Sequence, residues 1–531
     1  MTYKAIDLYA GVGGWAVGLQ LSGIGIQRSY EWWNSAVRTH EVNSSSDVRE
    51  IDIRTLELTE LPTNVNVVVG SPPCTEFSYS NRGGSGDIEN GLLDIEKFLE
   101  VVDHLRPTYW VMENVPRVKK ILEKELSPEG RLSRFSHLGL QAHIFDMSEY
   151  GLPQRRKRCI AGNINFDLLF SYRNKCKPLT LGSVIDSLHA SEVIDPIYGI
   201  KTSKSVLTDH DIEEALNDEE LRYNREWKCH HPVYNDMSFP EKLNTPVRTI
   251  TATCTRVSRE SIIIKNGQGK LRRLSVRERG CLQGFPTSFQ FHGNSYAQKI
   301  KMTGNAIPPV FTYYIGQAIL GVSPSELQPP STFVENLNTD VEKAPTTKVD
   351  SEGRSYRKDR RFWFAIPNLR FKSGWRFDLS NSKNEDEEYD WVVKFWHGNS
   401  KNILEVKLNK SLLLKTLDNK ALKPAKDQLS SLLRSVSSHK KKYTPEALQM
   451  VWTHREEGMH PYQLLDDLGA CSEAAIAIVN TISPEDRYKI SSEILGVKPD
   501  AQCVKKIKRF SSEIIAGILI GSKFNTSPFH L

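Results

Sequence analysis

A cysteine that directly follows two prolines is the residue of this chain with the most evident chemistry. Cys74 comes after Pro72 and Pro73, beyond an apolar run at residues 65–69. Prolines stiffen the backbone and lack an N–H donor, so the thiol would be held rigidly at the end of a strand. A thiolate is a strong nucleophile, and such a site should lower the pKa of its thiol. Most lone cysteines are inert core residues, but this setting favours a nucleophile.

An acid and two arginines form a second candidate group. Glu113 follows the apolar run at residues 109–112, where its carboxyl could bind or protonate a ring nitrogen. Within the basic run at residues 154–158, Arg156 and Arg158 would face the same way on a strand, which suits holding a carboxylate or a phosphate. A strand-end acid facing water and a solvated basic stretch are the plainer alternatives.

A glycine-rich turn follows the first predicted strand, at residues 5–9. The sequence Asp-Leu-Tyr-Ala-Gly-Val-Gly-Gly spans residues 7–14, and its glycines would let the backbone turn tightly and approach a nucleotide-like ligand. The next strand would end at Glu31, which could accept hydrogen bonds from ribose hydroxyls. Trp32 beside it offers an aromatic face to an adenine. A structural turn and a surface acid would look similar.

Bringing these candidates together requires a sheet whose strands end at one edge. Short, largely apolar runs alternate with amphipathic segments up to about residue 164. This alternation predicts an α/β fold with a Rossmann-like, mostly parallel sheet and helices on both faces. Ligands bind at the carboxyl ends of such strands. Cys74, Glu113 and the glycine-rich turn all follow predicted strands, as this rule requires.

Changes in pattern divide the rest of the chain. Residues 165–265 lack the strand–helix alternation, which predicts a small separate lobe, and helical periodicity returns at 274–282 and 310–320. A polar, proline-containing segment then has the composition of a linker. Strand-like and helical patterns beyond it indicate a mixed α+β domain. The predicted domains are 1–164 with 266–322, the lobe 165–265, a linker at 323–353, and 354–531.

Composition restricts the class of protein. Hydrophobic residues make up 39% and charged residues 25% of the 531 residues, as in globular proteins. No apolar run reaches the ~18–20 residues that span a bilayer, and the first residues lack the apolar core of a signal peptide. We therefore expect a cytoplasmic protein without a membrane segment. None of the eight cysteines forms a CxxC pair, which argues against structural zinc or a disulfide scaffold.

The net charge of +6 is unevenly distributed. Residues 331–531 hold 32 Lys and Arg against 26 Asp and Glu, so the whole excess of positive charge lies there. Basic surfaces suit phosphates, although ordinary solubility charge would look the same.

Taken together, the motifs resemble those of the DNA (cytosine-5) methyltransferases. The resemblance covers residues 1–322, and the motifs follow the family's order. They are the glycine-rich turn at 7–14, Pro-Pro-Cys at 72–74, Glu-Asn-Val at 113–115, Gln-x-Arg-x-Arg at 154–158, Arg277-Glu278 with Leu-Gln-Gly-Phe-Pro at 282–286, and Gly-Asn-Ala-Ile-Pro-Pro at 304–309. Two positions depart from the family's pattern: Thr75 stands where many members have glutamine, and Tyr9 replaces the commoner phenylalanine while keeping an aromatic face.

The resemblance implies S-adenosylmethionine as methyl donor and double-stranded DNA as substrate, with residues 165–265 as the target-recognition region. The implied cofactor positions are Asp7, Tyr9, Gly11, Gly13, Gly14, Glu31, Trp32, Asp52, Ile53, Pro73, Leu93 and Asn305. The expected DNA contacts are Ser78, Arg82, Gln154, Thr249 and Thr251. The last two would share one face of a strand.

The resemblance also implies a covalent route. Cys74 would attack C6 of a flipped-out cytosine, Glu113 would bind or protonate N3, and Arg158, with Arg156 beside it, would orient Glu113 or the intermediate. The glycine-rich loop at residues 82–86 could close over DNA.

The C-terminal region offers a weaker pattern. Asp390, fourteen residues and then Glu405-x-Lys407 resemble the arrangement of PD-(D/E)xK nucleases, in which two carboxylates hold Mg²⁺ and the lysine positions water. The predicted setting is a hairpin of strands 391–396 and 402–408. Mg²⁺ is expected only if this domain is a nuclease. An ordinary amphipathic hairpin in a DNA-binding or partner-binding domain, or a structural extension, would give the same pattern.

The sequence thus predicts a sequence-specific DNA cytosine-5 methyltransferase of a prokaryotic restriction–modification or phage-protection system. We expect a monomeric, nucleoid-associated protein, with a cognate restriction endonuclease as a candidate partner. Three alternatives remain open: a bifunctional methyltransferase–nuclease, a non-catalytic DNA-binding regulator, and an RNA cytosine methyltransferase.

Overall fold

The chain folds into two units. A computed structural model describes residues 3–44, 46–78, 86–177, 179–207, 213–229, 237–349, 356–371, 374–383, 388–399, 402–496 and 501–529. The N-terminal unit consists of Met1–Leu221 and Ser238–Asp350, and the C-terminal unit of Arg222–Met237 and Ser351–Leu531. Over the described ranges, no helix is both long and apolar enough to cross a bilayer.

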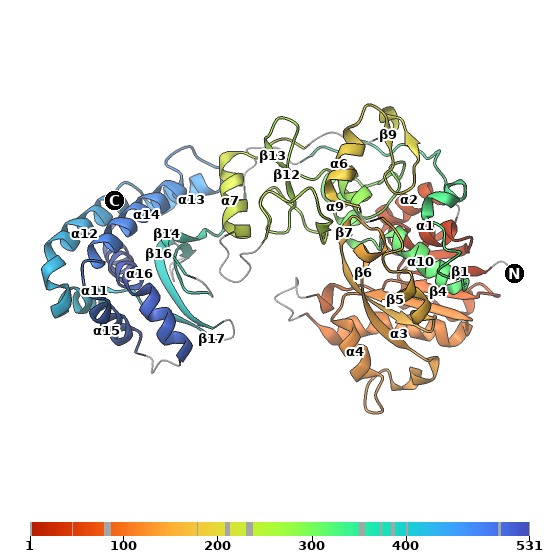
Figure 1. Cartoon of the computed structure of the whole chain (residues 1–531), viewed down its shortest axis with the longest axis horizontal. Helices are drawn as coiled ribbons and strands as arrows, with labels where there is room; N and C mark the ends of the chain where they lie inside the picture. Colours follow the sequence, from red (N-terminus) through yellow and green to blue (C-terminus); the bar gives the residue numbers. More distant parts are fainter. Residues whose placement is uncertain are drawn as a thin grey trace. The chain divides into compact units, whose positions relative to one another are not determined.

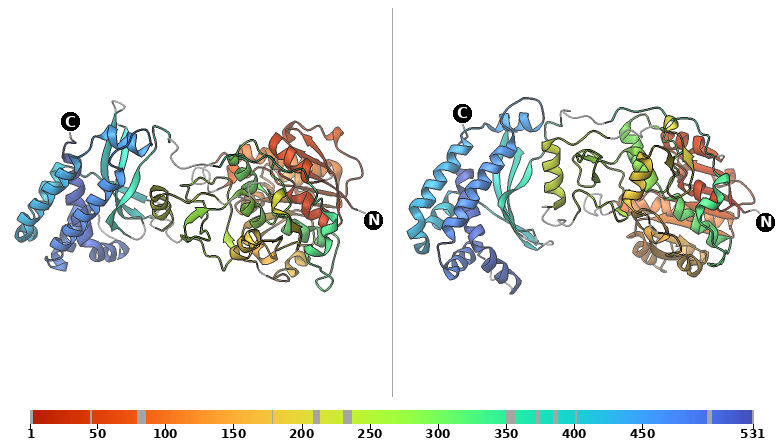
Figure 2. Two further views of the ribbon diagram at one scale, coloured as in Figure 1. Left: turned by 90° about the horizontal axis from the view of Figure 1, so that it is seen from above. Right: turned by 45° about the horizontal axis from the view of Figure 1, so that its top comes forward.

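A seven-stranded sheet forms the centre of the N-terminal unit (Figures 1 and 2). Strands β3, β2, β1, β4 and β5 run parallel to one another, and β8 runs antiparallel to both β5 and β6. This confirms the predicted Rossmann-like, mostly parallel sheet. In spatial order the strands are β3 (Asp47–Glu50), β2 (Gly25–Glu31), β1 (Lys4–Leu8), β4 (Val67–Gly70), β5 (Tyr109–Asn114), β8 (Lys157–Gly162) and β6 (Gln141–Asp146).

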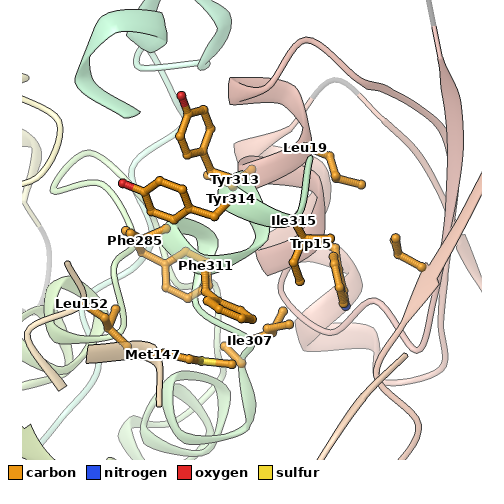
Figure 3. Close-up of a cluster of buried hydrophobic side chains, with 14 of the residues drawn as sticks. Trp15, Leu19, Met147, Leu152, Phe285, Ile307, Phe311, Tyr313, Tyr314 and Ile315 are labelled. Atoms are coloured by element: carbon orange, nitrogen blue, oxygen red, sulfur yellow. The ribbon is translucent and has the colours of Figure 1, made fainter. Parts of the chain in front are cut away.

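Alternate residues of the central strands enter two different cores, because helices cover both faces. Ala5 packs with α1 (Gly14–Leu21) and α10 (Pro309–Ile319), whereas Ile6 packs with α3 (Ile88–Leu105) and α4 (Val118–Glu125). Figure 3 shows part of the first core, in which Trp15 of α1 lies beside Ile315 of α10. Helix α2 (Asn34–Asn43) follows β2 on that face.

The close approach between the start of α1 and the segment just before α10 depends on a glycine. A Cβ at Gly14 would lie 2.1 Å from the carbonyl oxygen of Ile307. We therefore expect Gly14→Ala to lower the free energy of unfolding by about 1–3 kcal/mol, the usual cost of overpacking, measured by denaturant titration. Gly25 is the matched control, because a Cβ there would meet no atom within 4 Å. Equal stability of the two alanine variants would contradict this packing argument.

The region predicted as a recognition lobe is built from short elements. They are α5 (Phe166–Ser171), α6 (Leu181–His189), β9 (Val193–Ile194), β10 (Lys201–Thr202), α7 (Asp218–Cys229), β11 (Val247–Arg248) and β12 (Ile263–Lys265). Beyond residue 265 follow β13 (Leu271–Arg273), α8 (Val276–Leu282) and α9 (Tyr296–Asn305). Buried ion pairs tie it together, as between Arg273 and Glu213, whose nitrogen and oxygen lie 2.7 Å apart. Residues 222–237 belong instead to the C-terminal unit.

The segment expected to be a linker runs along the N-terminal unit. Ala344 is buried, and Lys299 donates a hydrogen bond of 2.6 Å to the carbonyl of Pro345. Arg38 forms an ion pair of 2.5 Å with Glu342. These contacts fix residues 342–345 in place, so this part is not a free tether.

The C-terminal unit combines an antiparallel sheet with a helical layer, as the predicted mixed α+β domain requires. The helices lie on one face of the sheet (Figures 1 and 2). The strands, in spatial order, are β14 (Trp363–Arg370), β15 (Arg376–Lys383), β16 (Tyr389–Asn399) and β17 (Asn402–Val406). The helices are α11 (Lys410–Leu417), α12 (Lys426–Lys440), α13 (Pro445–Trp452), α14 (Pro461–Val479), α15 (Pro484–Leu495) and α16 (Ala501–Thr526).

The second part of α7 packs into this unit. The ring of Tyr223 stacks on Trp452 with centroids 6.1 Å apart and meets the edge of Phe364 at 5.3 Å. Arg222 donates two hydrogen bonds, of 2.7 and 2.6 Å, to the carboxylate of Asp466. A short piece from the middle of the chain thereby completes the C-terminal core.

Candidate active site

The loop that carries Cys74 is fastened on both sides. It follows β4, and the short helix at Thr75–Phe77 begins directly after Cys74. The indole of Trp15 donates a hydrogen bond of 3.0 Å to the Ser71 hydroxyl, and the amide of Asn114 donates one of 3.0 Å to the carbonyl of Pro72. Cys74 itself stays partly accessible. The sequence thus produces the rigid, open presentation that a nucleophile needs.

Glu113 and Arg158 form an ion pair at the end of the neighbouring strands. Residue Glu113 pairs with Ile160 across β5 and β8, and the Arg158 Nε atom lies 2.9 Å from the carboxylate of Glu113. The side chain of Arg158 is only 13% exposed and that of Glu113 only 9%. A largely buried guanidinium therefore holds the carboxyl group in one orientation at the edge of the sheet.

Charged neighbours influence the thiol of Cys74. Burial raises its pKa, the positive charge of Arg158 lowers it, Glu113 raises it and Arg156 lowers it. The net pKa lies above the ordinary value, contrary to the lowering expected from the sequence, so the free site disfavours the thiolate. The two arginines are the charged groups that favour it.

Alkylation of Cys74 should report this balance. We expect the rate of reaction with iodoacetamide to rise with pH through an inflection above the ordinary cysteine pKa of about 8.5. In Arg158→Gln the inflection should move higher, because the variant removes a positive charge that lowers the pKa of Cys74 and leaves Glu113 unpaired. Peptide mass analysis across pH measures it. An inflection that moved down would contradict the assigned role of Arg158.

A cavity of about 430 Å³ adjoins the Cys74 loop. Five predicted cofactor residues line it, namely Tyr9, Trp32, Asp52, Ile53 and Pro73. The remaining lining residues are Arg54, Thr75, Glu76, Asn90, Gly91 and Asp94. Sequence reasoning missed the ion pair of 2.7 Å between Arg54 and Asp94, because no local pattern links residues that come together only through α3.

Glu31 shapes the glycine-rich turn. Its carboxylate accepts hydrogen bonds from the backbone N–H groups of Gly11 at 2.9 Å, Trp32 at 2.9 Å and Trp33 at 2.8 Å. Burial raises the pKa of Glu31, whereas these N–H groups lower it. The indole of Trp32 is 63% exposed and lines the cavity. An aromatic face next to carboxylate acceptors fits the base and the hydroxyl groups of an adenosine-like ligand.

Other predicted cofactor residues do not line this cavity. Asp7 is buried in β1, and burial raises its pKa well above the ordinary value. Gly13 and Gly14 serve packing: a Cβ at Gly13 would lie 2.7 Å from the ring of His40. Leu93 is 39% exposed on α3, and Asn305 is exposed at the end of α9.

The structure separates the two arginines that we expected to face the same way. The strand is interrupted at Arg156, because β7 (Gln154–Arg155) pairs with β11 and β8 begins only at Lys157. Arg156 is buried and donates hydrogen bonds to the carbonyls of Ile250, Gly304 and Ala306 at 3.2, 3.3 and 3.0 Å. Arg156 thus binds the backbone carbonyls of three distant residues, and Arg158 is the arginine that pairs with Glu113.

The predicted DNA contacts are also engaged within the protein. Gln154 is fully buried, where it donates to Gln283 at 2.7 Å and accepts from the N–H of Ile250 at 2.8 Å. This burial contradicts a contact with DNA. Thr249 donates to the Arg155 carbonyl at 2.8 Å and Thr251 to that of Thr253 at 2.9 Å.

Neither threonine lies in a strand, since β11 ends at Arg248, so the expected shared strand face is absent there. Ser78 is partly buried after the short helix that begins at Thr75. Arg82 and residues 83–85 lie outside the described residues.

The three nuclease candidates are not brought together. Glu405 pairs with Trp396, whereas Asp390 lies six positions earlier on β16 and pairs with Ser382. At about 3.3 Å per residue, the two carboxylates are about 20 Å apart along the strand. Glu405 and Lys407 are exposed. Across the described ranges, no group of His, Cys, Asp and Glu could hold a metal ion, so the predicted Mg²⁺ arrangement is not formed.

Comparisons with known proteins place the N-terminal region. The family model of C-5 cytosine-specific DNA methylases matches residues 3–321. The type II methyltransferase M.HindV of Haemophilus influenzae is 28% identical over 330 residues, covering 60% of this chain and 96% of that protein. M.HgiDI of Herpetosiphon aurantiacus is 25% identical over 324 residues, covering 60% and 94%. The crystal structure of S. pombe Dnmt2 methyltransferase is similar at a TM-score of 0.42 and 18% identity, over 61% of this chain and 99% of that one.

The family match spans more than half of the chain and contains the Cys74 loop, the Glu113–Arg158 pair and the adjoining cavity. The chain therefore belongs to the C-5 cytosine-specific DNA methylase family and is a DNA cytosine-5 methyltransferase.

Proposed function

We propose that this enzyme methylates one cytosine within a specific duplex sequence, through a covalent bond between Cys74 and C6 of the base. The observation that carries the proposal is the geometry of the strand ends. The partly accessible thiol of Cys74 lies on a loop that hydrogen bonds hold in place, and the carboxyl of Glu113, paired with Arg158, influences its pKa. A cavity adjoins this loop.

C5 of cytosine is a poor nucleophile until the ring loses its aromaticity. The Cys74 thiolate forms a bond to C6, and the displaced electron pair develops at C5. Glu113, held by Arg158, donates a hydrogen bond or proton at N3 and stabilises this charge. After C5 gains the methyl group, its proton leaves to a base. The electron pair then re-forms the C5–C6 double bond and expels the Cys74 thiolate.

The residues of the cavity fit S-adenosylmethionine, which the family uses. When bound, it supplies an electrophilic methyl group. Trp32 and Tyr9 would contact its aromatic base, Asp52 would accept hydrogen bonds from its polar groups, and Pro73 would place it beside the Cys74 loop. Because a paired cytosine hides C6 in the stack, the target base must leave the duplex to meet Cys74.

The setting we propose is restriction–modification. M.HindV and M.HgiDI are both named type II methyltransferases. By this analogy the enzyme protects host DNA at the sequence that a cognate endonuclease cuts. Its partner is DNA, and no membrane is involved.

A methyl-transfer experiment tests the proposal. The full chain is incubated with labelled S-adenosylmethionine and mixed-sequence duplex DNA, and 5-methylcytosine is mapped by sequencing. We expect label at one cytosine of one short sequence. A duplex with 5-fluorocytosine at that position should trap an adduct on the peptide that contains Cys74, because fluorine cannot leave as the C5 proton does. Label at another base, or an adduct elsewhere, would overturn the proposed route.

A further inference from the structure

The outer face of the C-terminal sheet carries an arrangement that methyl transfer does not use. On β15 and β16, Phe377 and Phe395 point into the core beneath the helices. Side chains therefore point the other way at alternate positions. That opposite surface, named here the outer face, carries Trp363 of β14, Arg376 and Asp378 of β15, and Lys394 and Trp396 of β16.

A buried carboxylate fixes the geometry of this face. Asp378 is only 1% exposed, although it belongs to the face turned away from the core. It accepts hydrogen bonds from the indole N–H of Trp363 at 2.5 Å and from Nε of Arg376 at 2.6 Å. The guanidinium of Arg376 in turn covers one face of the Trp363 ring, with its carbon 5.2 Å from the centroid. One face of Trp363 is thus occupied, and the side chain remains 40% exposed.

A cavity of about 520 Å³ opens beside these rings. Its lining includes both indoles, the phenol of Tyr389 and three cationic side chains, namely Arg361, Lys383 and Lys394. Among the described residues of the lining, the only acid is Asp359, which accepts two hydrogen bonds from Arg357, of 3.0 and 2.8 Å. Within the described part of the chain Arg361 and Lys394 make no ion pair.

A further donor in the lining lacks an acceptor. The Nε1–H of Trp396 is buried, and nothing in the described part of the chain accepts its hydrogen bond. A buried donor of this kind costs free energy unless a partner supplies an acceptor. The rings of Trp363 and Trp396 lie 6.4 Å apart and are tilted by 57°. They therefore form an open wedge, not a parallel sandwich.

These features together define a ligand. Exposed indole faces attract flat aromatic rings, and the excess of cations attracts phosphate. A nucleotide combines both. Bases in a duplex hide their faces in the stack, so the ring faces of this site could be used only by an unpaired base.

We propose that the outer face of the β14–β17 sheet binds an unpaired nucleotide, with the base on Trp363 or Trp396 and a phosphate on Lys394 and Arg361. The source is a single strand of DNA or a free nucleotide. This site shares no described residue with the methylation site and does not depend on the proposed route of methyl transfer.

Fluorescence anisotropy of the full chain with a labelled oligothymidylate strand tests the site. Loss of one stacking contact should weaken binding by about tenfold in Trp363→Ala, and Lys394→Glu should weaken it similarly by reversing a phosphate-binding charge. Trp363→Phe keeps a flat ring and should bind more tightly than the alanine variant. The matched control is Lys415→Glu, an exposed lysine on α11, which should bind like the unchanged protein. Circular dichroism verifies that each variant is folded.

DNA binding by the N-terminal unit contributes equally to the signal of every variant. Crosslinking identifies the residues that contact the strand. A strand with 4-thiothymidine should crosslink within residues 359–396. If thymidine monophosphate displaces the labelled strand as effectively as an unlabelled strand does, the ligand is a free nucleotide. If only the unlabelled strand displaces it, the ligand is single-stranded DNA. The proposal would be overturned by unchanged affinity in both Trp363→Ala and Lys394→Glu, by crosslinks only elsewhere, or by a loss of blunt-duplex binding in these variants as large as their loss of strand binding. Loss of methyl transfer in these variants would also overturn it, because the site would then belong to methylation.

Discussion

Replacing Cys74 with alanine should lower the rate of methyl transfer by at least about 10⁴-fold, as loss of a covalent nucleophile does in other enzymes. Without the bond to C6, the cytosine ring keeps its aromaticity and C5 stays unreactive. Single-turnover transfer of labelled methyl groups measures the loss. Binding of S-adenosylmethionine, followed by calorimetry, should persist, because Pro73 and Thr75 line the cavity and Cys74 does not.

Cys229→Ala is the matched control for this experiment. Cys229 is a partly buried thiol at the end of α7, and its loss should leave methyl transfer unchanged. A Cys74→Ala enzyme that still transferred methyl groups at a tenth of the original rate would refute nucleophilic attack by this thiol.

Glu113→Gln should lower the rate of methyl transfer by about 10²–10⁴-fold, the range for loss of general acid catalysis. Glutamine keeps the shape of the side chain but cannot donate a proton to N3 or neutralise Arg158. The partner guanidinium, only 13% exposed, is then left without its counter-charge, so the variant should also melt at a lower temperature.

The kinetic loss must be separated from the loss of stability. Single-turnover rates are therefore measured well below the melting temperature found by circular dichroism. Glu129→Gln, an exposed position beyond α4, is the control and should match the unchanged enzyme. If Glu113→Gln lost only stability and kept its rate, Glu113 would be a structural partner of Arg158 and not an acid.

The edge of the sheet at which the site forms could be predicted from the sequence. Apolar runs fixed the positions of β1, β4 and β5, and parallel strands with helical crossovers must end at a common edge. Cys74 follows β4, and Glu113 lies next to the end of the adjacent strand β5, so their proximity follows from pattern and topology alone. The ion pair between Glu113 and Arg158 needed only one further strand, β8, beside β5.

Other features depended on partners far away in sequence. Strand periodicity predicted one shared face for Arg156 and Arg158, but the carbonyls of Gly304 and Ala306 draw Arg156 away. Strand β14 was missed because Pro367 and the left-handed Asn368, with φ of 68°, break its regularity. An alternating pattern could have revealed this strand: Phe362, Phe364 and Ile366 lie in the core, and Trp363 between them is exposed.

The chain passes between its two units three times, because residues 222–237 belong to the C-terminal unit while the segments on both sides of them do not. A protein shortened at residue 350 would therefore keep Tyr223 and Trp227 but lose Phe364 and Trp452, the rings that cover them. Such a protein would expose these two rings on α7. The C-terminal unit is thus not an independent appendage, because its loss would also uncover part of a helix that begins in the N-terminal unit.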